Sequence, residues 1–253
     1  MARFEDSTVM VTGAAGGLGL AIATAFAGEG AHVVLVDRDA GRLEEAAQAL
    51  RAQGASCEAR DADLGDEAAI VQLCAAFCDA HECLDVLVNN AGLAYGEVAN
   101  GFFGLGLAKW QHFLAINAIA PLLLAEHLRA PLARAGGLIV NQSSMASHVP
   151  GTAYGVTKAT LNAMTFGLAS QLAGDGIRCV AIAPGLMETP ASLGALGEDT
   201  LRGLTGMQLA PARRGTPEDI ANACLFLASK EGSFINNTVL PVDAGNRLRG
   251  YRG

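Results

Sequence analysis

The chain has 253 residues, of which 51% are hydrophobic and 17% charged, and its formal net charge is −8 at pH 7. This apolar content excludes a disordered chain, because disorder requires low hydrophobicity. The negative charge disfavours partners such as nucleic acids and anionic membranes, which need clustered cations. The basic residues Arg247, Arg249 and Arg252 are interpreted as a solvated terminus.

Short runs rich in β-branched residues alternate along the chain with longer segments of helical period. Strands of this kind are buried on both faces, as in a parallel sheet covered by helices. The expected strands are Val9–Thr12, His32–Val36, Ser56–Ala59, Leu84–Val88, Leu138–Val140, Ile177–Ala183 and Thr238–Val242. The expected helices begin near Gly17, Gly41, Asp66, Lys109, Thr152 and Pro217, with N-caps at Asp66 and Thr216. The prediction is an α/β fold with a doubly wound, Rossmann-like parallel sheet of about seven strands.

No linker or internal repeat divides residues 1–253, so we predict a single domain. The segment 186–214 breaks the alternation, because several glycines and prolines stand among scattered leucines. Such a segment is typical of a mobile lid over an apolar site, and an irregular surface insertion is the alternative.

Six cysteines are too sparse for a disulfide scaffold, and no leader opens the sequence, so a cytoplasmic protein with reduced thiols is expected. Cys74, Cys78, His81 and Cys83 lie close enough in the sequence to suggest zinc. The first two follow the period of a buried helix face, and paired C-x-x-C motifs are lacking, so we predict no metal site. 

The stretch from Ser7 to Gly28 contains no charged residue. Its cluster of glycines, which would interrupt a helix, argues against a membrane span, and a strand, a turn and a helix explain it better. The turn TGAAGGLG, Thr12 to Gly19, lets backbone amides at a helix N-terminus approach a diphosphate. Its G-x-x-x-G-x-G spacing departs from the G-x-G-x-x-G dinucleotide motif, so the glycines alone are weak evidence.

Asp37 ends the second expected strand, near the distance from the glycines at which an acid contacts the adenosine ribose. A carboxylate there repels a 2′-phosphate and favours NAD over NADP. An aspartate that simply closes a strand is the alternative. Arg38 and Arg42 favour the opposite preference, since a guanidinium accommodates the extra phosphate.

Tyr154 and Lys158 stand at i and i+4 of an expected helix, on one face. A phenol with a pKa near 10 is a poor base at neutral pH, and lowering its pKa to about 7 requires about 4 kcal/mol of stabilisation of the phenolate. A nearby ammonium, together with an oxidised nicotinamide ring, can supply that field.

With these motifs in place, the chain resembles the short-chain dehydrogenase/reductase family from about Thr8 to Gly245. Besides TGAAGGLG and YGVTK, the resemblance rests on Asp63-Leu64, NNAG ending at Gly92, Asn117, the strand IVNQSS ending at Ser144, and PGLMET from Pro184 to Thr189. It implies a catalytic set of Ser144, Tyr154, Lys158 and Asn117. It implies cofactor contacts from Gly13, Gly16, Gly17, Leu18, Gly19, Asp37, Asp63, Leu64, Asn90, Ala91, Gly92, Tyr154, Lys158, Pro184, Gly185, Met187 and Thr189.

In the roles that the resemblance implies, Tyr154 is the general acid/base, Lys158 lowers its pKa and holds the nicotinamide ribose, and Ser144 hydrogen-bonds the substrate oxygen. Asn117 holds a water in a proton relay. Ser144 precedes Tyr154 by only ten positions, a shorter loop than is common in the family, so Ser143 or Ser147 is an alternative. Ser144 is kept because it stands three residues after Asn141.

The leading hypothesis is an NAD-dependent oxidoreductase that transfers hydride between a secondary alcohol or ketone and the nicotinamide. The alternatives are an NADPH-dependent 3-oxoacyl-thioester reductase of the same fold and a non-catalytic nucleotide-binding protein. The expected substrate is a small apolar alcohol or ketone, and the family suggests a homotetramer or homodimer. Residues left between a substrate-facing and a packing role are His148, Tyr95, Phe102, Phe103 and Trp110.

Overall fold

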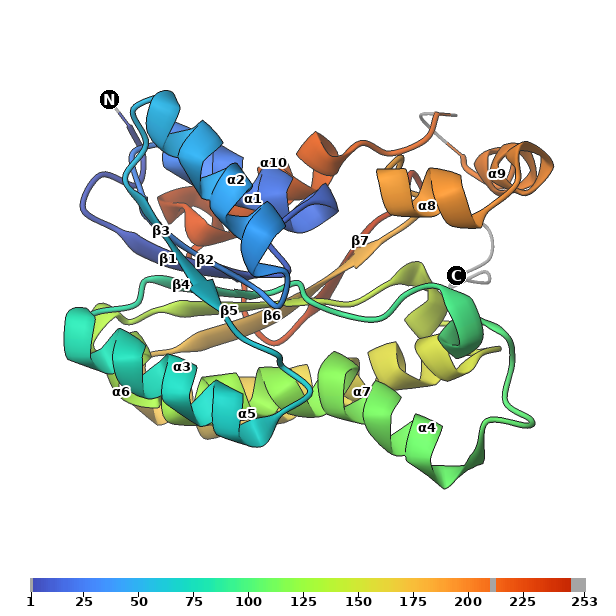
Figure 1. Ribbon diagram of the computed structural model, residues 1–253, viewed down its shortest axis with the longest axis horizontal. Helices are drawn as coiled ribbons and strands as arrows, with labels where there is room; N and C mark the ends of the chain where they lie inside the picture. Colours follow the sequence, from blue (N-terminus) through green and yellow to red (C-terminus); the bar gives the residue numbers. More distant parts are fainter. Residues whose placement is uncertain (1, 210–212, 247–253) are drawn as a thin grey trace.

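The computed structural model describes residues 2–209 and 213–246 (Figure 1). Seven strands form one sheet in the order β3-β2-β1-β4-β5-β6-β7, and every pairing is parallel. The predicted α/β fold is confirmed. The strands are β1 Thr8–Thr12, β2 His32–Asp37, β3 Cys57–Asp61, β4 Val86–Asn89, β5 Leu138–Gln142, β6 Arg178–Pro184 and β7 Val239–Val242.

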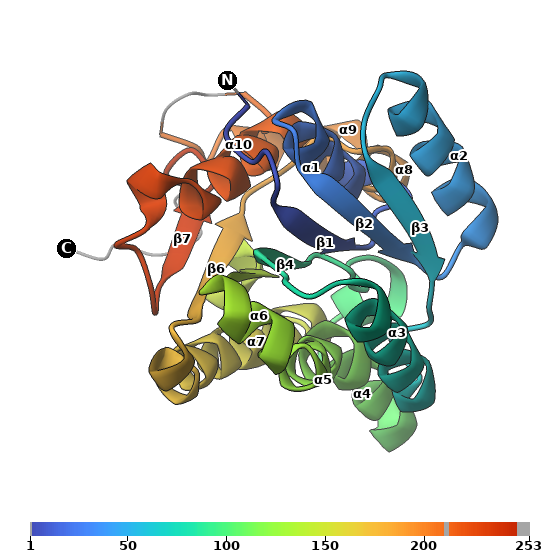
Figure 2. The same cartoon turned by 90° about the vertical axis from the view of Figure 1, so that its left-hand side faces the viewer.

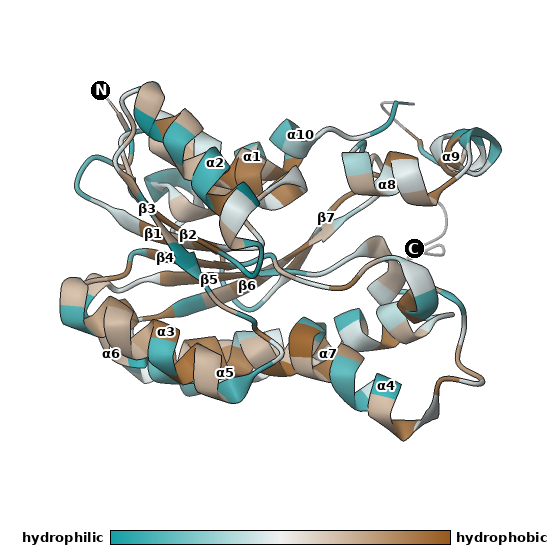
Figure 3. Ribbon diagram, in the orientation of Figure 1, coloured by the Kyte–Doolittle hydropathy of each residue, from teal (hydrophilic) through white to brown (hydrophobic). Residues whose placement is uncertain are grey.

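Two layers of helices cover the sheet, one on each face (Figures 1 and 2). One face carries α1 Gly17–Gly28, α2 Ala40–Ala52 and α10 Pro217–Ala228. The other carries α3 Glu67–Ala80, α5 Ala120–His127, α6 Arg129–Ala135 and α7 Ala153–Gln171. Because successive strand residues point to opposite faces, Val9 and Val11 of β1 join the first core, and Met10 joins the second. Figure 3 shows hydrophobic residues along the central strands, as burial on both faces requires.

The strand order reverses between β1 and β4, since β2 follows β1 on one side and β4 lies on the other. The connections after these two strands run to opposite sides of the sheet, and a crevice opens beyond their carboxyl ends. The glycine turn follows β1 and the NNAG motif begins in β4, so both motifs border this crevice.

Helix starts follow the predicted caps. The carboxylate of Asp66 accepts the amide N–H of Ala68, and Thr216 forms a reciprocal capping box with Asp219 at the start of α10. The helix expected from Lys109 begins instead at Gly106 as α4, Gly106–Leu114, and continues through a π-helical turn, Ala115–Ile119, into α5.

The cysteines suggested as zinc ligands do not converge. Cys74 is buried in the core beneath α3, Cys78 of the same helix is exposed, and all six cysteines are free thiols. Within residues 2–209 and 213–246, no single helix is long and apolar enough to cross a membrane. One pair, Gly106–His127 with Arg129–Ala135, meets the length and composition criterion together, but it is bent by 65°.

Candidate active site

Two cavities of about 600 and 380 Å³ lie at the carboxyl edge of the sheet. The larger is bordered by the glycine turn, the end of β2 and the Asp63-Leu64 pair, and the smaller by Ser144, Tyr154 and Lys158. They form one continuous cleft, because they share the wall residues Gly17, Asn90, Gly92, Thr189 and Ala191.

The turn after β1 is fastened to the end of β4 by Thr12 and Asn90. The hydroxyl oxygen of Thr12 accepts the amide N–H groups of Asn90 and Ala91, each at 3.0 Å, and the Asn90 amide donates to the Thr12 carbonyl at 2.8 Å. Gly13 has φ +67°, a backbone conformation that favours glycine. These bonds fix the shape of the loop that borders the larger cavity.

The first turn of α1 presents free backbone donors to the cleft. Its N-cap, Gly16, has no side chain to accept them, and no acidic residue stands in the first turn. Gly17 and Leu18 line the cleft at this point. An anionic group fits here, because the orphan N–H groups and the positive end of the helix dipole both favour negative charge.

Asp37 lies at the far end of the larger cavity, and two backbone amides hold its carboxylate. Ala15 of the glycine loop donates to Oδ2 and Asp39 donates to Oδ1, both at 3.1 Å. Arg38 and Arg42 line the same cavity. The guanidinium of Arg42 passes over the glycine loop, within 3.2 Å of the point where a Cβ on Gly16 would stand.

The structure brings most of the predicted residues into the cleft. Gly19 and Asn117 are the predicted residues that, within the described chain, border neither cavity. Gly19 packs behind the loop against the Gly13 carbonyl. The predicted residues that line the cleft are Gly13, Gly16, Gly17, Leu18, Asp37, Asp63, Leu64, Asn90, Ala91, Gly92, Ser144, Tyr154, Lys158, Pro184, Gly185, Met187 and Thr189.

Tyr154 reaches the smaller cavity from the first turn of α7, where Thr152 caps the helix by accepting the Gly155 amide at 3.2 Å. Burial raises the pKa of Tyr154 to about 12, and hydrogen bonding with Ser144 opposes this rise. The phenol is therefore neutral at physiological pH.

Lys158 is buried one turn later, with 2% of its surface exposed. Its ammonium donates to the Gln142 carbonyl at 2.6 Å and stands 5.9 Å from the centre of the Tyr154 ring. Burial lowers the pKa of Lys158 to about 8. Burial therefore disfavours the charged forms of both groups, and the sequence-based expectation, in which an oxidised nicotinamide ring adds its field to that of Lys158, stays a prediction.

The three candidate serines differ in what holds them. Ser143 donates to the hydroxyl of Ser147, and Ser147 in turn donates to the Ser144 carbonyl at 2.7 Å. The hydroxyl of Ser144 accepts the Ala146 amide and is hydrogen-bonded with Tyr154 in the cavity that both residues line. The geometry therefore favours Ser144 over Ser143 and Ser147 as a donor to a bound ligand.

Asn117 lies in the π-helical turn and is fully buried. Its Oδ1 accepts the Leu93 amide at 2.7 Å, and its Nδ2 donates to the Leu93 carbonyl and to the Thr157 hydroxyl. These bonds tie the turn to the NNAG loop and to α7, so the side chain positions the wall. Gly92 fits between Asn117 and Lys158, whose atoms would stand 3.1 and 3.3 Å from an added Cβ.

Sequence reasoning missed the roles of two polar residues, one behind the glycine loop and one in the wall of the cleft. Thr12 organises the loop through its hydroxyl, and only its place at the end of a strand hinted at this. Gln142 lines the smaller cavity, and its buried Oε1 meets no hydrogen-bond donor in the described part of the chain. No spacing rule pointed to Gln142, because its orientation follows from the register of β5.

The aromatic residues after NNAG separate into two groups. Tyr95 lines the smaller cavity, and burial raises its pKa, against hydrogen bonding with Ser192 and Thr189. The ring of Phe102 stacks on that of Trp110, with 6.4 Å between the ring centres, and Phe103 is exposed. His148, Phe102, Phe103 and Trp110 are not among the described residues that border the two cavities.

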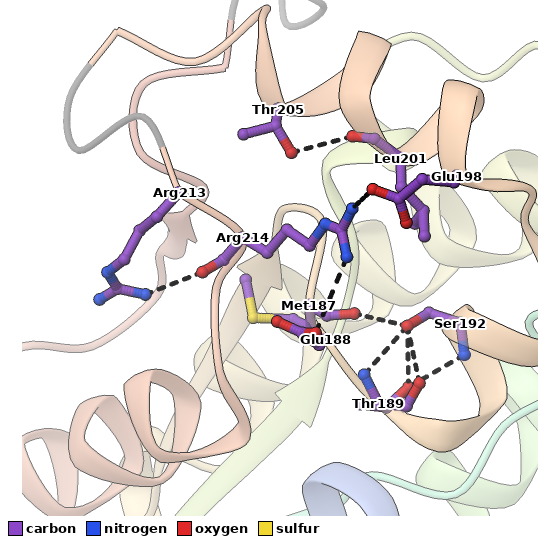
Figure 4. A network of polar contacts seen from close by, with 9 residues as sticks. All are labelled: Met187, Glu188, Thr189, Ser192, Glu198, Leu201, Thr205, Arg213 and Arg214. Atoms are coloured by element: carbon purple, nitrogen blue, oxygen red, sulfur yellow. Dashed lines mark hydrogen bonds and ion pairs between the residues drawn. The ribbon is translucent and has the colours of Figure 1, made fainter.

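The segment 186–214 contains two helices, α8 Pro190–Ala195 and α9 Glu198–Thr205, and its residues 210–212 lie outside the described structure. Leu196 and Leu204 of this segment line the smaller cavity. Figure 4 shows Arg214 between Glu188, at 3.7 Å, and Glu198 of α9, so one guanidinium joins the end of the PGLMET motif to α9.

The pH dependence of stability tests the burial of Lys158. Its pKa is near 8 in the folded chain and 10.5 when unfolded, so between these pH values the unfolded chain binds the extra proton and stability rises with pH. The free energy of unfolding of wild type minus that of Lys158→Met should therefore grow by roughly 3 kcal/mol from pH 8 to 10.5. Urea unfolding at several pH values measures it. A difference that does not change with pH would show that the ammonium is solvated.

Known proteins resemble this chain over nearly its whole length. A family model described as enoyl-(acyl carrier protein) reductase matches residues 13–247. The galactitol 2-dehydrogenase (L-tagatose-forming) of Cereibacter sphaeroides is 36% identical, with 96% of each chain covered. The serine 3-dehydrogenase of Agrobacterium fabrum is 35% identical, with 98% of each covered.

Solved structures also resemble this chain over nearly its whole length. L-sorbose reductase from Gluconobacter frateurii, complexed with NADPH and L-sorbose, superposes with a TM-score of 0.88 at 29% identity, over 97% of this chain and 98% of that one. A 7α-hydroxysteroid dehydrogenase complexed with NADH has a TM-score of 0.88 at 27% identity, over 97% and 96%. With the motifs and the cleft described above, these matches show that the chain belongs to the short-chain dehydrogenase/reductase family of nicotinamide-dependent oxidoreductases.

Proposed function

We propose that the protein is an NAD-dependent dehydrogenase that moves a hydride between a secondary alcohol or its ketone and the nicotinamide, with Tyr154 as general acid/base. The observation that carries this proposal is the meeting of Ser144, Tyr154 and Lys158 in a cavity that opens directly onto the glycine turn. The two connected cavities suit a dinucleotide in the larger and a small substrate in the smaller.

The cleft fits the cofactor along its length. The free amides at the start of α1 suit the diphosphate, and the anchored Asp37 suits the hydroxyls of the adenosine ribose. Lys158 lies where it can hold the second ribose, and Pro184 to Thr189 border the part of the cleft beside the candidate catalytic groups. When bound, the cofactor supplies the hydride acceptor or donor.

The chain's own residues handle the proton. In oxidation, the Tyr154 oxygen takes the proton of the substrate hydroxyl while Ser144 hydrogen-bonds the substrate oxygen. In reduction, Tyr154 returns it. Because burial raises the pKa of Tyr154 to about 12, the field of a positively charged nicotinamide must add to that of Lys158 before the phenol can act as a base. Asn117 supports this site by holding Leu93 and Thr157 in place.

Tyr154→Phe should abolish turnover while NAD still binds, since only the phenolic oxygen is removed. A positioned acid/base contributes roughly 100- to 10,000-fold. Initial rates measured by NADH absorbance, with NAD affinity from fluorescence quenching as the control for an intact cleft, test this. Activity above about one hundredth of wild type would contradict the proton-transfer role of Tyr154.

Asp37 and the pair Arg38 and Arg42 have opposite effects on the choice between NAD and NADP. The Asp37 carboxylate supports NAD, because it repels a 2′-phosphate, whereas the two guanidinium groups in the same cavity would attract one. The solved relatives include complexes with NADPH and with NADH, so the family does not decide the choice.

Asp37→Ala should lower the ratio of kcat/KM for NAD to kcat/KM for NADP by roughly tenfold, the effect of about 1.4 kcal/mol. The matched variant Arg42→Ala should change the NAD value little and weaken NADP use. An unchanged ratio in Asp37→Ala would remove that carboxylate from the ribose site. A wild-type preference for NADPH that Arg42→Ala abolishes would favour the 3-oxoacyl-thioester reductase alternative.

The non-catalytic alternative has less support, because Ser144, Tyr154 and Lys158 keep a reactive arrangement that nucleotide binding alone does not need. A broad alcohol screen that yields no NADH, from a protein that binds NAD tightly, would favour it.

The lining of the smaller cavity supports a substrate with an apolar body and a second polar group. Met145, Leu196 and Leu204 supply apolar surface. Gln142 brings an unpaired buried amide oxygen, which costs about 1–3 kcal/mol unless a ligand or the amide's own rotation satisfies it. Purely apolar alcohols, the expectation from the sequence, would leave this amide unpaired. Polyols, the substrates in the names of several relatives, would satisfy it.

We also propose that 186–214 acts as a lid over the substrate, held by the Arg214 ion pairs. Arg214→Ala should raise KM for the alcohol by roughly tenfold with a smaller change in kcat, because binding must then order α9. Arg213→Ala is the matched control, since Arg213 pairs with Asp219 of α10 instead. Steady-state kinetics measure both variants. Equal effects in the two variants, or none in Arg214→Ala, would contradict the lid.

The proposed assembly is a homotetramer or homodimer in the cytoplasm. Exposed apolar side chains support it, with Ile119 and Phe166 on the side of the sheet covered by α5 and α7, and Phe226 and Phe234 near α10. The free thiols are consistent with a reducing compartment.

A further inference from the structure

A second cluster of chemically capable side chains lies at the opposite edge of the sheet from the cleft. His32 begins β2, Glu58 lies near the start of β3, and His81 caps the end of α3. One ligand atom from each residue lies within 4.8 Å of the others. In Figure 1, α3 ends on the left of the molecule, whereas α8 and α9 of the cleft lie on the right.

The hydrogen bond of the His32 imidazole orients it in the way that suits a metal ligand. Its Nδ1 lies 2.7 Å from the Ser56 hydroxyl, and its Nε2 is buried with no hydrogen-bond partner among residues 2–209 and 213–246. When Nδ1–H donates to Ser56, Nε2 carries a free lone pair. A hydrogen bond to the far nitrogen is the usual way in which proteins orient a metal-binding histidine.

Glu58 and His81 complete the set. The Nε2 of His81 lies 3.0 Å from Oε1 of Glu58, and the ring of His81 stacks on Phe77 at 4.7 Å. Arg60 bonds only the other oxygen of Glu58, at 2.9 Å, and so orients the carboxylate without covering Oε1. The cluster also stands at the carboxyl end of α3, where the helix dipole favours a cation.

We propose that His32, Glu58 and His81 bind a divalent ion of the Zn²⁺ type, with water as the fourth ligand. Two histidines and one carboxylate are a ligand set that zinc takes in proteins, at about 2.0–2.2 Å from each atom. Tetrahedral ligand atoms at that distance from the ion lie roughly 3.4 Å from one another. Side-chain rotations that move the three ligand atoms by about 1 Å would therefore bring them to this spacing. The ion joins β2, β3 and α3, and it stabilises the folded chain by mass action.

Without an ion, His81 and Glu58 still pair, but the buried lone pair or N–H of His32 Nε2 remains unsatisfied. A bound cation removes that cost. His81 also belongs to the sequence group with Cys74, Cys78 and Cys83 that suggested zinc, although those thiols do not converge in the described part of the chain. The experiment therefore has to distinguish nitrogen and oxygen ligands from sulfur.

The test uses the full chain without a polyhistidine tag, freed of metal with a chelator. Titration calorimetry with ZnCl₂ should show one ion per chain, and the thermal midpoint should rise with added Zn²⁺. His32→Gln and His81→Gln should each weaken Zn²⁺ binding at least about 100-fold, and Ser56→Ala about tenfold, the range of second-shell losses. Co²⁺ in the same site should give visible absorption of a tetrahedral ion without a thiolate charge-transfer band.

The matched controls are His112→Gln and His127→Gln, exposed histidines on α4 and α5, which should bind Zn²⁺ as wild type does. The double variant Cys78→Ser/Cys83→Ser should also bind normally. Circular dichroism confirms that each variant is folded. Loss of binding in the cysteine variant, a thiolate band with Co²⁺, or unchanged affinity in His32→Gln would each overturn the proposal.

Discussion

One buried ammonium group joins two walls of the smaller cavity. Lys158 of α7 donates to the carbonyl of Gln142, the last residue of β5, and thereby fixes the helix that carries Tyr154 against the strand that leads to Ser144. Burying this charge is costly, and the lowered pKa of Lys158 records the cost. The fold tolerates the charge because the central strands β1, β4, β5 and β6 are buried along most of their length.

The hydrogen bonds of Asn117, Thr12 and Asn90 also hold the walls of the cleft together. Asn117 holds the NNAG loop and α7 together from within the π-helical turn, and Thr12 with Asn90 joins the ends of β1 and β4. Both sets of bonds satisfy buried polar groups that a continuous helix or a wider loop would leave unpaired. The walls of the cleft are thus determined before any ligand arrives, as a preorganised site requires.

The fold could be predicted from the sequence because strands and helices leave local patterns of residues. Each expected strand is present within about two residues, since β-branched runs between turns have few other uses. The π-helical turn at Asn117 was not predicted, because it depends on bonds to Leu93 and Thr157 that only the tertiary structure creates. The helices α8 and α9 were also missed, since glycine-rich composition argues against helix. The pKa of Tyr154 depends on burial, which no spacing reveals, and the His32, Glu58 and His81 cluster depends on strand register.

The anchoring of Asp37 has a consequence for protein engineering. In the proposed function its carboxylate selects the coenzyme by charge, and in the structure it is also the acceptor of the Ala15 and Asp39 amide N–H groups. Replacing Asp37 with a small or basic side chain, in order to change the proposed coenzyme preference, would therefore also release the Ala15 amide of the glycine loop. An asparagine would retain an oxygen for one of those amides while discarding the negative charge, which makes it the gentler starting point for redesign.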